Sequence, residues 1–239
     1  MKKSFGVAVA LTLLAGGIAS NAMAANCDSG EMIRFAQNGF AYETNYNIST
    51  YTSTAGSQLS IVGIVDYFCT PLASLVPDAN TEYTLYITGL TSQGTTNPIP
   101  GVVYACNYTG GTWEIHQGSP KNAPTAASMP PLPDATVPAN FIDGPIVLSG
   151  TLANFSTTIT KNGTSAGGSF RADYVSTGGT YFSQVGGGQA VFQGTWCPTP
   201  KPTGCVPATY SAHPDGKWDV PPTTPTLPST WGTVKMLYR

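Results

Sequence analysis

Two short polar motifs contain residue types that bind metal ions. In the first, Glu114 and His116 are two positions apart, so on a β-strand both side chains point to the same face. Imidazole and carboxylate groups suit zinc or a related ion, but one of each is fewer ligands than such a site uses. The spacing therefore favours a polar strand face over a metal site.

The second motif runs from His213 to Asp219 with the sequence His-Pro-Asp-Gly-Lys-Trp-Asp. Its oxygen ligands, Asp215 and Asp219, suit a structural calcium ion, but no calcium-loop motif surrounds them. The Pro-Asp-Gly sequence favours a turn instead, because proline fixes φ, aspartate bonds its own backbone and glycine frees the exit. We expect no cofactor, with structural calcium as the alternative.

A Gly-x-Ser-x-Gly pattern spans residues 163–167. In hydrolases this pattern places a nucleophilic serine on a sharp turn from a strand into a helix, beside a base. Here Asn162-Gly163 is a hairpin signal between two strands, so we interpret the segment as a turn. We identify no catalytic residue. Paired carboxylates for glycoside hydrolysis come together only in a fold, so the sequence leaves that alternative open.

The five cysteines predict a disulfide framework with one thiol left over. Cys197 and Cys205 bracket a proline-rich loop, which predicts a local disulfide. Cys69 and Cys106 each interrupt or end an apolar strand, which predicts a cross-strand disulfide. Cys27 then stays unpaired near the N-terminus or links two chains. No Cys-x-x-Cys motif is present to support a haem, redox or zinc site.

The first 24 residues have the form of a bacterial secretory signal peptide. Lys2 and Lys3 precede an apolar stretch from Phe5 to about Ile18, and Ala22-Met23-Ala24 has the small-x-small form of a cleavage site. The apolar stretch is too short for a membrane span. We therefore expect the mature chain to be secreted, periplasmic or on the cell surface, where disulfides persist.

The composition excludes several classes of partner. Only 9% of the residues are charged and the formal net charge is −2, so there is no excess of cations to bind nucleic acid or an anionic membrane surface. No later apolar run is long enough to span a membrane. Twelve Tyr, nine Phe and four Trp argue against a disordered chain.

Alternating apolar and polar residues dominate the rest of the chain. One example is the segment in which Tyr83, Leu85 and Ile87 alternate with polar neighbours. Turn signals recur between such segments, including Gly110-Gly111, which predicts a tight hairpin. We expect a single all-β domain over 25–239, an antiparallel β-sandwich or jelly-roll-like fold of about ten strands. Proline-rich stretches predict a loop at 119–140 and an irregular C-terminal segment at 198–230.

These features predict an exported, non-enzymatic β-sandwich protein with a structural, adhesive or matrix-associated role at or outside the bacterial cell surface. One alternative is a carbohydrate-binding module or a glycan-acting enzyme, since aromatic side chains stack on sugars. Another is a subunit of an extracellular assembly that pairs strands with its neighbours. The expected partners are polysaccharide or other surface proteins, and self-association is compatible with the sequence.

Overall fold

The computed structural model describes residues 27–36, 38–125, 138–199, 205–207 and 209–220, and their regular structure is almost entirely antiparallel β. This confirms the all-β class predicted from the alternating sequence. The strands are β1 (Glu31–Phe35), β2 (Gly39–Glu43), β3 (Tyr46–Asn47), β4 (Thr52–Ser53), β5 (Gln58–Ile64), β6 (Tyr67–Phe68), β7 (Glu82–Ile99), β8 (Val103–Gly118), β9 (Ile146–Asn162), β10 (Ser165–Gly178), β11 (Gln189–Cys197) and β12 (His213–Asp219). A 3-10 turn, η1 (Ala139–Phe141), and a short helix, α1 (Phe182–Val185), complete the elements. Within these described ranges, no helix is long and apolar enough to cross a membrane.

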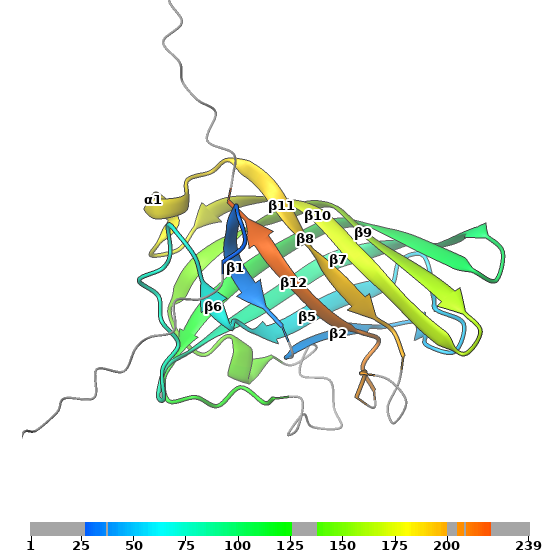
Figure 1. Ribbon diagram of the computed structural model, residues 1–239, viewed down its shortest axis with the longest axis horizontal. Coiled ribbons are helices and arrows are strands. Elements are labelled where there is room, and N and C mark those ends of the chain that lie inside the picture. The colour runs from blue at the N-terminus through cyan, green and yellow to red at the C-terminus, as the bar shows by residue number, and fades with distance from the viewer. Residues whose placement is uncertain (1–26, 37, 126–137, 200–204, 208, 221–239) are drawn as a thin grey trace, which may run out of the picture.

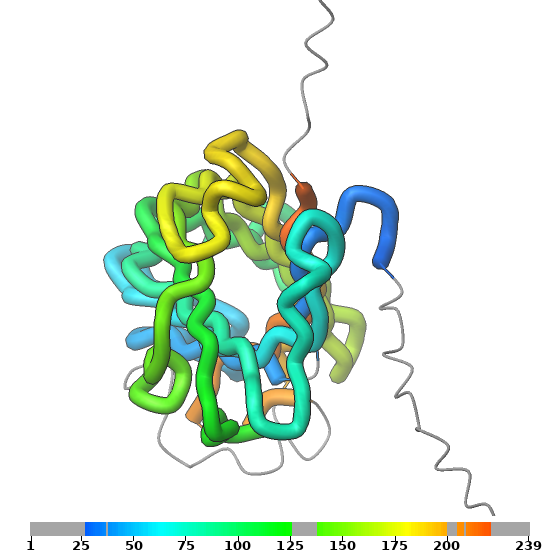
Figure 2. The backbone as a smooth tube through the Cα atoms, turned by 90° about the vertical axis from the view of Figure 1, so that its left-hand side faces the viewer, coloured from blue at the N-terminus to red at the C-terminus, as the bar shows by residue number. Residues whose placement is uncertain are grey.

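Ten strands form one sheet, in the order β2-β5-β7-β8-β9-β10-β11-β12-β1-β6 (Figure 1). The sheet is curled into a half-barrel, and Figure 2 shows its backbone as a ring. The ends of the strand order meet because β1 leads directly into β2, and β5 leads directly into β6. The Asp66 N–H donates to the Arg34 carbonyl at 2.9 Å, and the Ala41 N–H donates to the Ala212 carbonyl at 2.9 Å. The inner face of this sheet therefore surrounds a common core, and β3 and β4 form a separate two-stranded sheet.

Aromatic rings fill the inside of the curled sheet. The Phe192 and Trp218 rings stack with centroids 4.0 Å apart, and the Phe170 centroid lies 4.7 Å from that of Phe192. Trp113 and Trp218 are fully buried, with centroids 5.9 Å apart. Tyr83, Leu85 and Ile87 also join this core, as their alternation predicts. Large aromatic side chains supply most of the apolar area that such a core removes from water.

A second, smaller core covers the outer face of β2 and β5. Phe40 and Val62 point outward there and are covered by Phe141 of η1 and by Val206 and Tyr210 of the segment that follows β11. Both faces of β5 are thus buried, which explains why its sequence is apolar on both sides. The predicted loop at 119–140 has no strand in its described parts, and its residues 126–137 lie outside the described ranges.

The predicted hairpin at Gly110-Gly111 is wrong, because β8 continues straight through it. Residues on both sides of the glycine pair form ladders with the same neighbours, β7 and β9. The two glycines have φ values of +74° and +107° and let the strand bend with the curl of the sheet. A Cβ on Gly111 would lie 2.7 Å from the Leu90 side chain, so the bend also brings the two strands close together.

The predicted turn at Pro214-Asp215-Gly216 is also wrong, because these residues lie in β12. Pro214, Gly216 and Trp218 point inward and are buried, while the residues between them are partly exposed. The Pro214 backbone has no N–H to donate, but β12 pairs with β1 only from Gly216 onward. Pairing with β11 and β1 therefore overrides the local preference for a turn. The predicted irregular segment at 198–230 contains this strand, and its residues 200–204, 208 and 221–230 lie outside the described ranges.

The disulfide predictions are half right. Cys197 and Cys205 are bonded as expected, across the loop that leads from β11 to β12. Cys69 is bonded to Cys27, however, and Cys106 is a buried free thiol. The interpretation of Cys27 as unpaired or intermolecular is therefore wrong. Cys27 lies just before β1 and Cys69 just after β6, and these two strands pair, which brings the thiols together.

We expect Gly194→Ala to destabilise the protein by about 1–3 kcal/mol, as overpacking of a close-packed site does. A Cβ on Gly194 would contact the Asp215 carbonyl oxygen, which is rigid backbone in the next strand. Gly167→Ala is the matched control, because Gly167 also lies in a strand but has nothing within 4 Å of its Cβ position. Denaturant unfolding measures both, and equal midpoints for the two variants would contradict the close approach.

The second prediction concerns the free thiol. Cys106 is 5% exposed, so it should resist modification by a thiol reagent in the native protein. After denaturation without reductant, one thiol per chain should react, and peptide mapping should place the label on Cys106. Cys106→Ser should abolish the labelling and leave both disulfides in place. A label on Cys27 or Cys69 would overturn the observed pairing.

Candidate functional site

The structure brings Glu114 and His116 together on one face of β8, as their spacing predicts. His116 Nε2 lies 3.0 Å from the Glu114 carboxylate, and His116 Nδ1 lies 3.0 Å from the Gly144 carbonyl oxygen. Both imidazole nitrogens thus have hydrogen-bond partners within the protein. Among the described residues, no group of three or more His, Cys, Asp or Glu side chains is placed to hold a metal ion. The pair links β8 to the segment before β9.

His213, Asp215 and Asp219 share the outer face of β12 but do not converge on one point. The Asp219 carboxylate accepts from Gln193 at 3.1 Å and lies 3.4 Å from the Lys217 ammonium. The His213 ring packs instead against Phe40, with centroids 5.3 Å apart. These side chains therefore belong to different neighbourhoods along the strand.

The Gly-x-Ser-x-Gly segment is a hairpin turn, as its interpretation predicts. β9 ends at Asn162, β10 begins at Ser165, and these two residues pair across the two-residue connection. A strand rather than a helix follows the serine, so the geometry of a nucleophile elbow is not present at this position.

A buried polar cluster lies inside the curled sheet where β2, β4, β7 and β8 meet. The Glu43 carboxyl accepts hydrogen bonds from the Tyr108 hydroxyl, at 2.9 Å, and from the Ser53 hydroxyl. The Ser53 and Ser92 hydroxyls are 2.5 Å apart, and the Cys106 thiol lies 3.2 Å from Ser92. Burial raises the pKa of Glu43 above its ordinary value of 4.5, and the hydrogen bonds from Ser53 and Tyr108 offset part of that rise. The cluster ties the small β3–β4 sheet to the large one.

A row of polar side chains lies on the outer face of the sheet. Strand register places the following residues side by side across β10, β11, β12, β1 and β6: Arg171, Gln193, Lys217, Arg34 and Tyr67. We call this set the outer row. Figure 1 shows the first four of these strands side by side. Five adjacent strands at about 4.8 Å spacing make the row about 19 Å long.

Hydrogen bonds and ion pairs connect one half of the outer row. The Arg171 guanidinium donates to the Gln193 amide oxygen at 3.3 Å, and the Gln193 amide nitrogen donates to Asp219 at 3.1 Å. Asp219 in turn lies 3.4 Å from the Lys217 ammonium. These contacts connect Arg171, Gln193 and Lys217 through Asp219.

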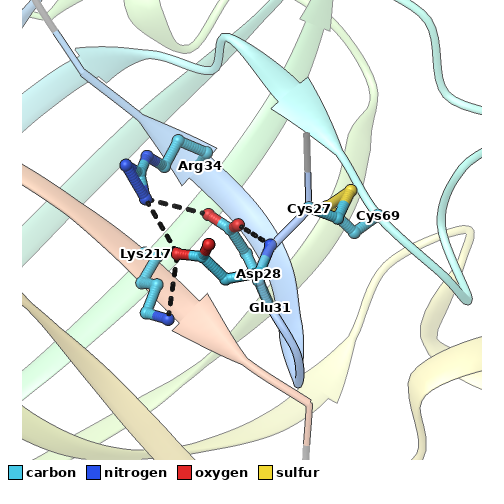
Figure 3. The surroundings of a disulfide bond; sticks show 6 residues. All are labelled: Cys27, Asp28, Glu31, Arg34, Cys69 and Lys217. Carbon is cyan, nitrogen blue, oxygen red and sulfur yellow. Dashed lines mark hydrogen bonds and ion pairs between the residues drawn. A yellow bond between two sulfur atoms is a disulfide. The ribbon is translucent and has the colours of Figure 1, made fainter. Parts of the chain in front are cut away.

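The other half is anchored by the N-terminal disulfide. The Asp28 carboxylate lies between two cations, 3.8 Å from Lys217 and 3.8 Å from Arg34, as Figure 3 shows. The buried Glu31 carboxylate accepts from Arg34 at 3.3 Å and from the Asp28 N–H at 2.9 Å. Because Asp28 directly follows Cys27, the disulfide to the end of β6 fixes the carboxylate that joins the two cations.

Two hollows lie along the outer row, one toward each end. The hollow toward Arg171 has a volume of about 460 Å³, and the backbones of Gly194 and Gly216 contribute to its lining. The hollow beside Tyr67 has a volume of about 610 Å³, and its lining is mainly apolar. Its apolar part comes from Phe68, Ala73, Leu75, Val76, Pro77 and Val220. Hollows of this size are typical of small-ligand sites.

The outer row offers binding rather than bond-breaking chemistry. Its guanidinium, ammonium, amide and phenol groups donate hydrogen bonds, and the neighbouring Asp and Glu carboxylates accept them. Sequence reasoning named Asp215 and Asp219 only as metal ligands and missed the row itself. The one usable signal was the alternation of His213, Asp215, Lys217 and Asp219, whose period of two marks one strand face.

Comparison with known protein families, with curated proteins and with solved structures found no match to this chain.

The raised pKa of Glu43 predicts a pH-dependent difference between Glu43→Gln and the wild type. A carboxyl whose pKa is higher in the folded state contributes most to stability below its unfolded pKa, near 4.5, and loses that contribution as the pH rises through the folded value. Glutamine stays neutral. The unfolding free energy of the variant, relative to wild type, should therefore increase from pH 4 to pH 8.

Asp78→Asn is the control with the opposite sign. Backbone N–H groups of Asn80 and Thr81 donate to the Asp78 carboxylate and hold its pKa below the ordinary value. Its contribution to stability is present above its unfolded pKa, near 3.8, and is lost as the pH falls through the lower folded value. The unfolding free energy of Asp78→Asn, relative to wild type, should therefore decrease as the pH rises from about 2 to 5 and stay level above that. If the difference in unfolding free energy between Glu43→Gln and wild type also decreased with pH, this would contradict the raised pKa of Glu43.

Proposed function

We propose that this chain is an exported, non-enzymatic module with an adhesive or matrix-associated role at or outside the bacterial cell surface, and that the outer row is its binding face. The leader over residues 1–24 supports export. Two disulfides support an oxidising compartment.

The observation that carries the binding role is the ordered outer row. Hydrogen bonds and ion pairs through Asp219 and Asp28 connect its side chains from β10, β11, β12 and β1, so these have less conformational freedom to lose on binding. Strands position such groups more rigidly than loops do. The flanking hollows, of about 460 and 610 Å³, give a ligand surfaces to enter on both sides of the row.

The interior supports a surface role rather than a carrier role. Trp113, Trp218 and Phe192 are fully buried and pack against one another inside the curled sheet. These rings occupy the space that a ligand would take in a carrier with an open centre. Binding at the outside of the sheet is therefore the role that the packing favours.

Co-sedimentation with insoluble extracellular matrix tests this proposal. The purified full-length protein, with its disulfides intact, should sediment with a cell-free matrix preparation. A double variant, Arg171→Ala with Gln193→Ala, should lose most of that binding. Lys161→Ala is the matched control, since Lys161 lies at the far end of β9 and outside the outer row, and it should bind as wild type does. Wild-type protein that stays in the supernatant, or a control variant that fails equally, would overturn the proposal.

A second experiment tests export. The cysteine-containing peptides of protein isolated from the native host should show both disulfides, and the mature N-terminus should follow Ala24. Protein retained in the cytoplasm with its leader and free thiols would contradict the exported role.

A further inference from the structure

Arg171 is the cation of the outer row whose charge is available to a ligand. Among the described residues of the row, its guanidinium donates to the neutral Gln193 amide oxygen, at 3.3 Å. Arg34 and Lys217 each lie within 4 Å of acidic side chains instead. A hydrogen bond to a neutral amide leaves the guanidinium charge uncompensated and most of its five donors free.

A second line of polar side chains faces the outer row across the 460 Å³ hollow. Ser169, Thr195 and Asp215 lie side by side on β10, β11 and β12 by strand register. On each strand they are two residues from the outer row, so the two lines are about 7 Å apart. The hollow therefore has a cationic side and a side of hydroxyl and carboxylate groups.

Glycine makes the floor of this hollow. Gly194 and Gly216 lie between the two lines, and their missing side chains point into the protein, where a Cβ on Gly216 would meet the Phe170 ring at 2.5 Å. The floor between the two lines is therefore strand backbone, with the Phe170 ring packed beneath Gly216. Hydrogen-bonding groups on both sides of the hollow suit a highly hydroxylated molecule better than a bulky apolar one.

We propose that this hollow binds a sugar unit of a polysaccharide that carries carboxylate groups, such as a polyuronate. Arg171 holds the carboxylate, and Asp215, Thr195 and Ser169 bond the ring hydroxyls. This inference rests on the proposed function and names the ligand class for the same face. Guanidinium groups bind carboxylates through two parallel hydrogen bonds, and carboxylates accept well from hydroxyls.

The length of the outer row favours a polymer over a single sugar. The row continues from Arg171 for about 19 Å to Tyr67, whose ring borders the second hollow. An aromatic ring at that end provides a stacking surface for a further sugar unit. A chain seated at Arg171 and extended across the strands passes Gln193, Lys217 and Arg34 before it reaches Tyr67.

Binding measurements with soluble polymers test the proposal. Calorimetric titration of the full-length protein with polygalacturonate and with size-matched neutral dextran should show that polygalacturonate binds at least about tenfold more tightly. Arg171→Gln should reduce affinity for polygalacturonate by about tenfold, the lower end for a hydrogen bond to a charged group, and leave dextran unchanged. Asp215→Asn should weaken polygalacturonate binding as well, because it loses a hydroxyl acceptor.

Several outcomes would overturn the proposed acidic-polysaccharide ligand without deciding whether the protein has an adhesive role. Equal affinity for dextran and polygalacturonate would show that the ligand's carboxylate does not contribute to binding. Tighter polygalacturonate binding by Asp215→Asn would show that Asp215 repels the ligand rather than bonding its hydroxyls. If Lys161→Gln and Arg171→Gln lost affinity for polygalacturonate equally, the polymer would be attracted by overall charge rather than bound at Arg171. In each case matrix co-sedimentation, measured separately, decides the proposed function on its own.

Discussion

The packing of aromatic rings against glycine across β10, β11, β12 and β1 is the constraint on which the rest of the structure depends. Strand register aligns Phe170, Gly194, Gly216 and Phe35 in one inward-facing line. Gly216 leaves the space that the Phe170 ring fills, and Gly194 lets the backbone of β12 approach β11 closely. Close packing of this kind fixes each strand at a defined height and angle, because protein interiors tolerate few voids and little strain.

The outer face follows from that inner arrangement. Successive residues of a strand point to opposite faces, so every side chain locked in the core fixes the position of its neighbours outside. Phe192 and Trp218 stack inside, and Gln193 and Lys217 next to them therefore meet outside. The core therefore sets where the side chains of the outer row begin, and their surface ion pairs, which contribute little individually, add to that order.

The two disulfides lie beside the N-terminal strand and in the connection between β11 and β12. Cys27–Cys69 ties the chain before β1 to the short strand β6, which is two residues long, and Cys197–Cys205 closes the connection from β11 to β12. A covalent link stabilises a fold by reducing the conformational freedom of the unfolded chain, and the effect is larger for the 42-residue separation of Cys27 and Cys69 than for the 8-residue separation of Cys197 and Cys205. Buried polar groups add specificity of a different kind, since Glu43 gathers hydroxyls from three other strands into one satisfied cluster.

Some features of this protein follow from the sequence alone because they depend on neighbours a few residues apart. The alternation around Tyr83, Leu85 and Ile87 specifies a strand with one buried face, Asn162-Gly163 specifies a hairpin, and the short separation of Cys197 from Cys205 specifies their bond.

Features that join distant parts of the chain were decided by strand register, which only the tertiary structure fixes. The glycine pair at 110–111 favours a turn in isolation, and continuous pairing with β7 and β9 makes it a bend within a strand. Cys69 bonds Cys27, 42 residues away, because β1 and β6 pair. The outer row likewise joins residues from 34 to 217, and no local pattern relates side chains that only the lateral order of strands brings together.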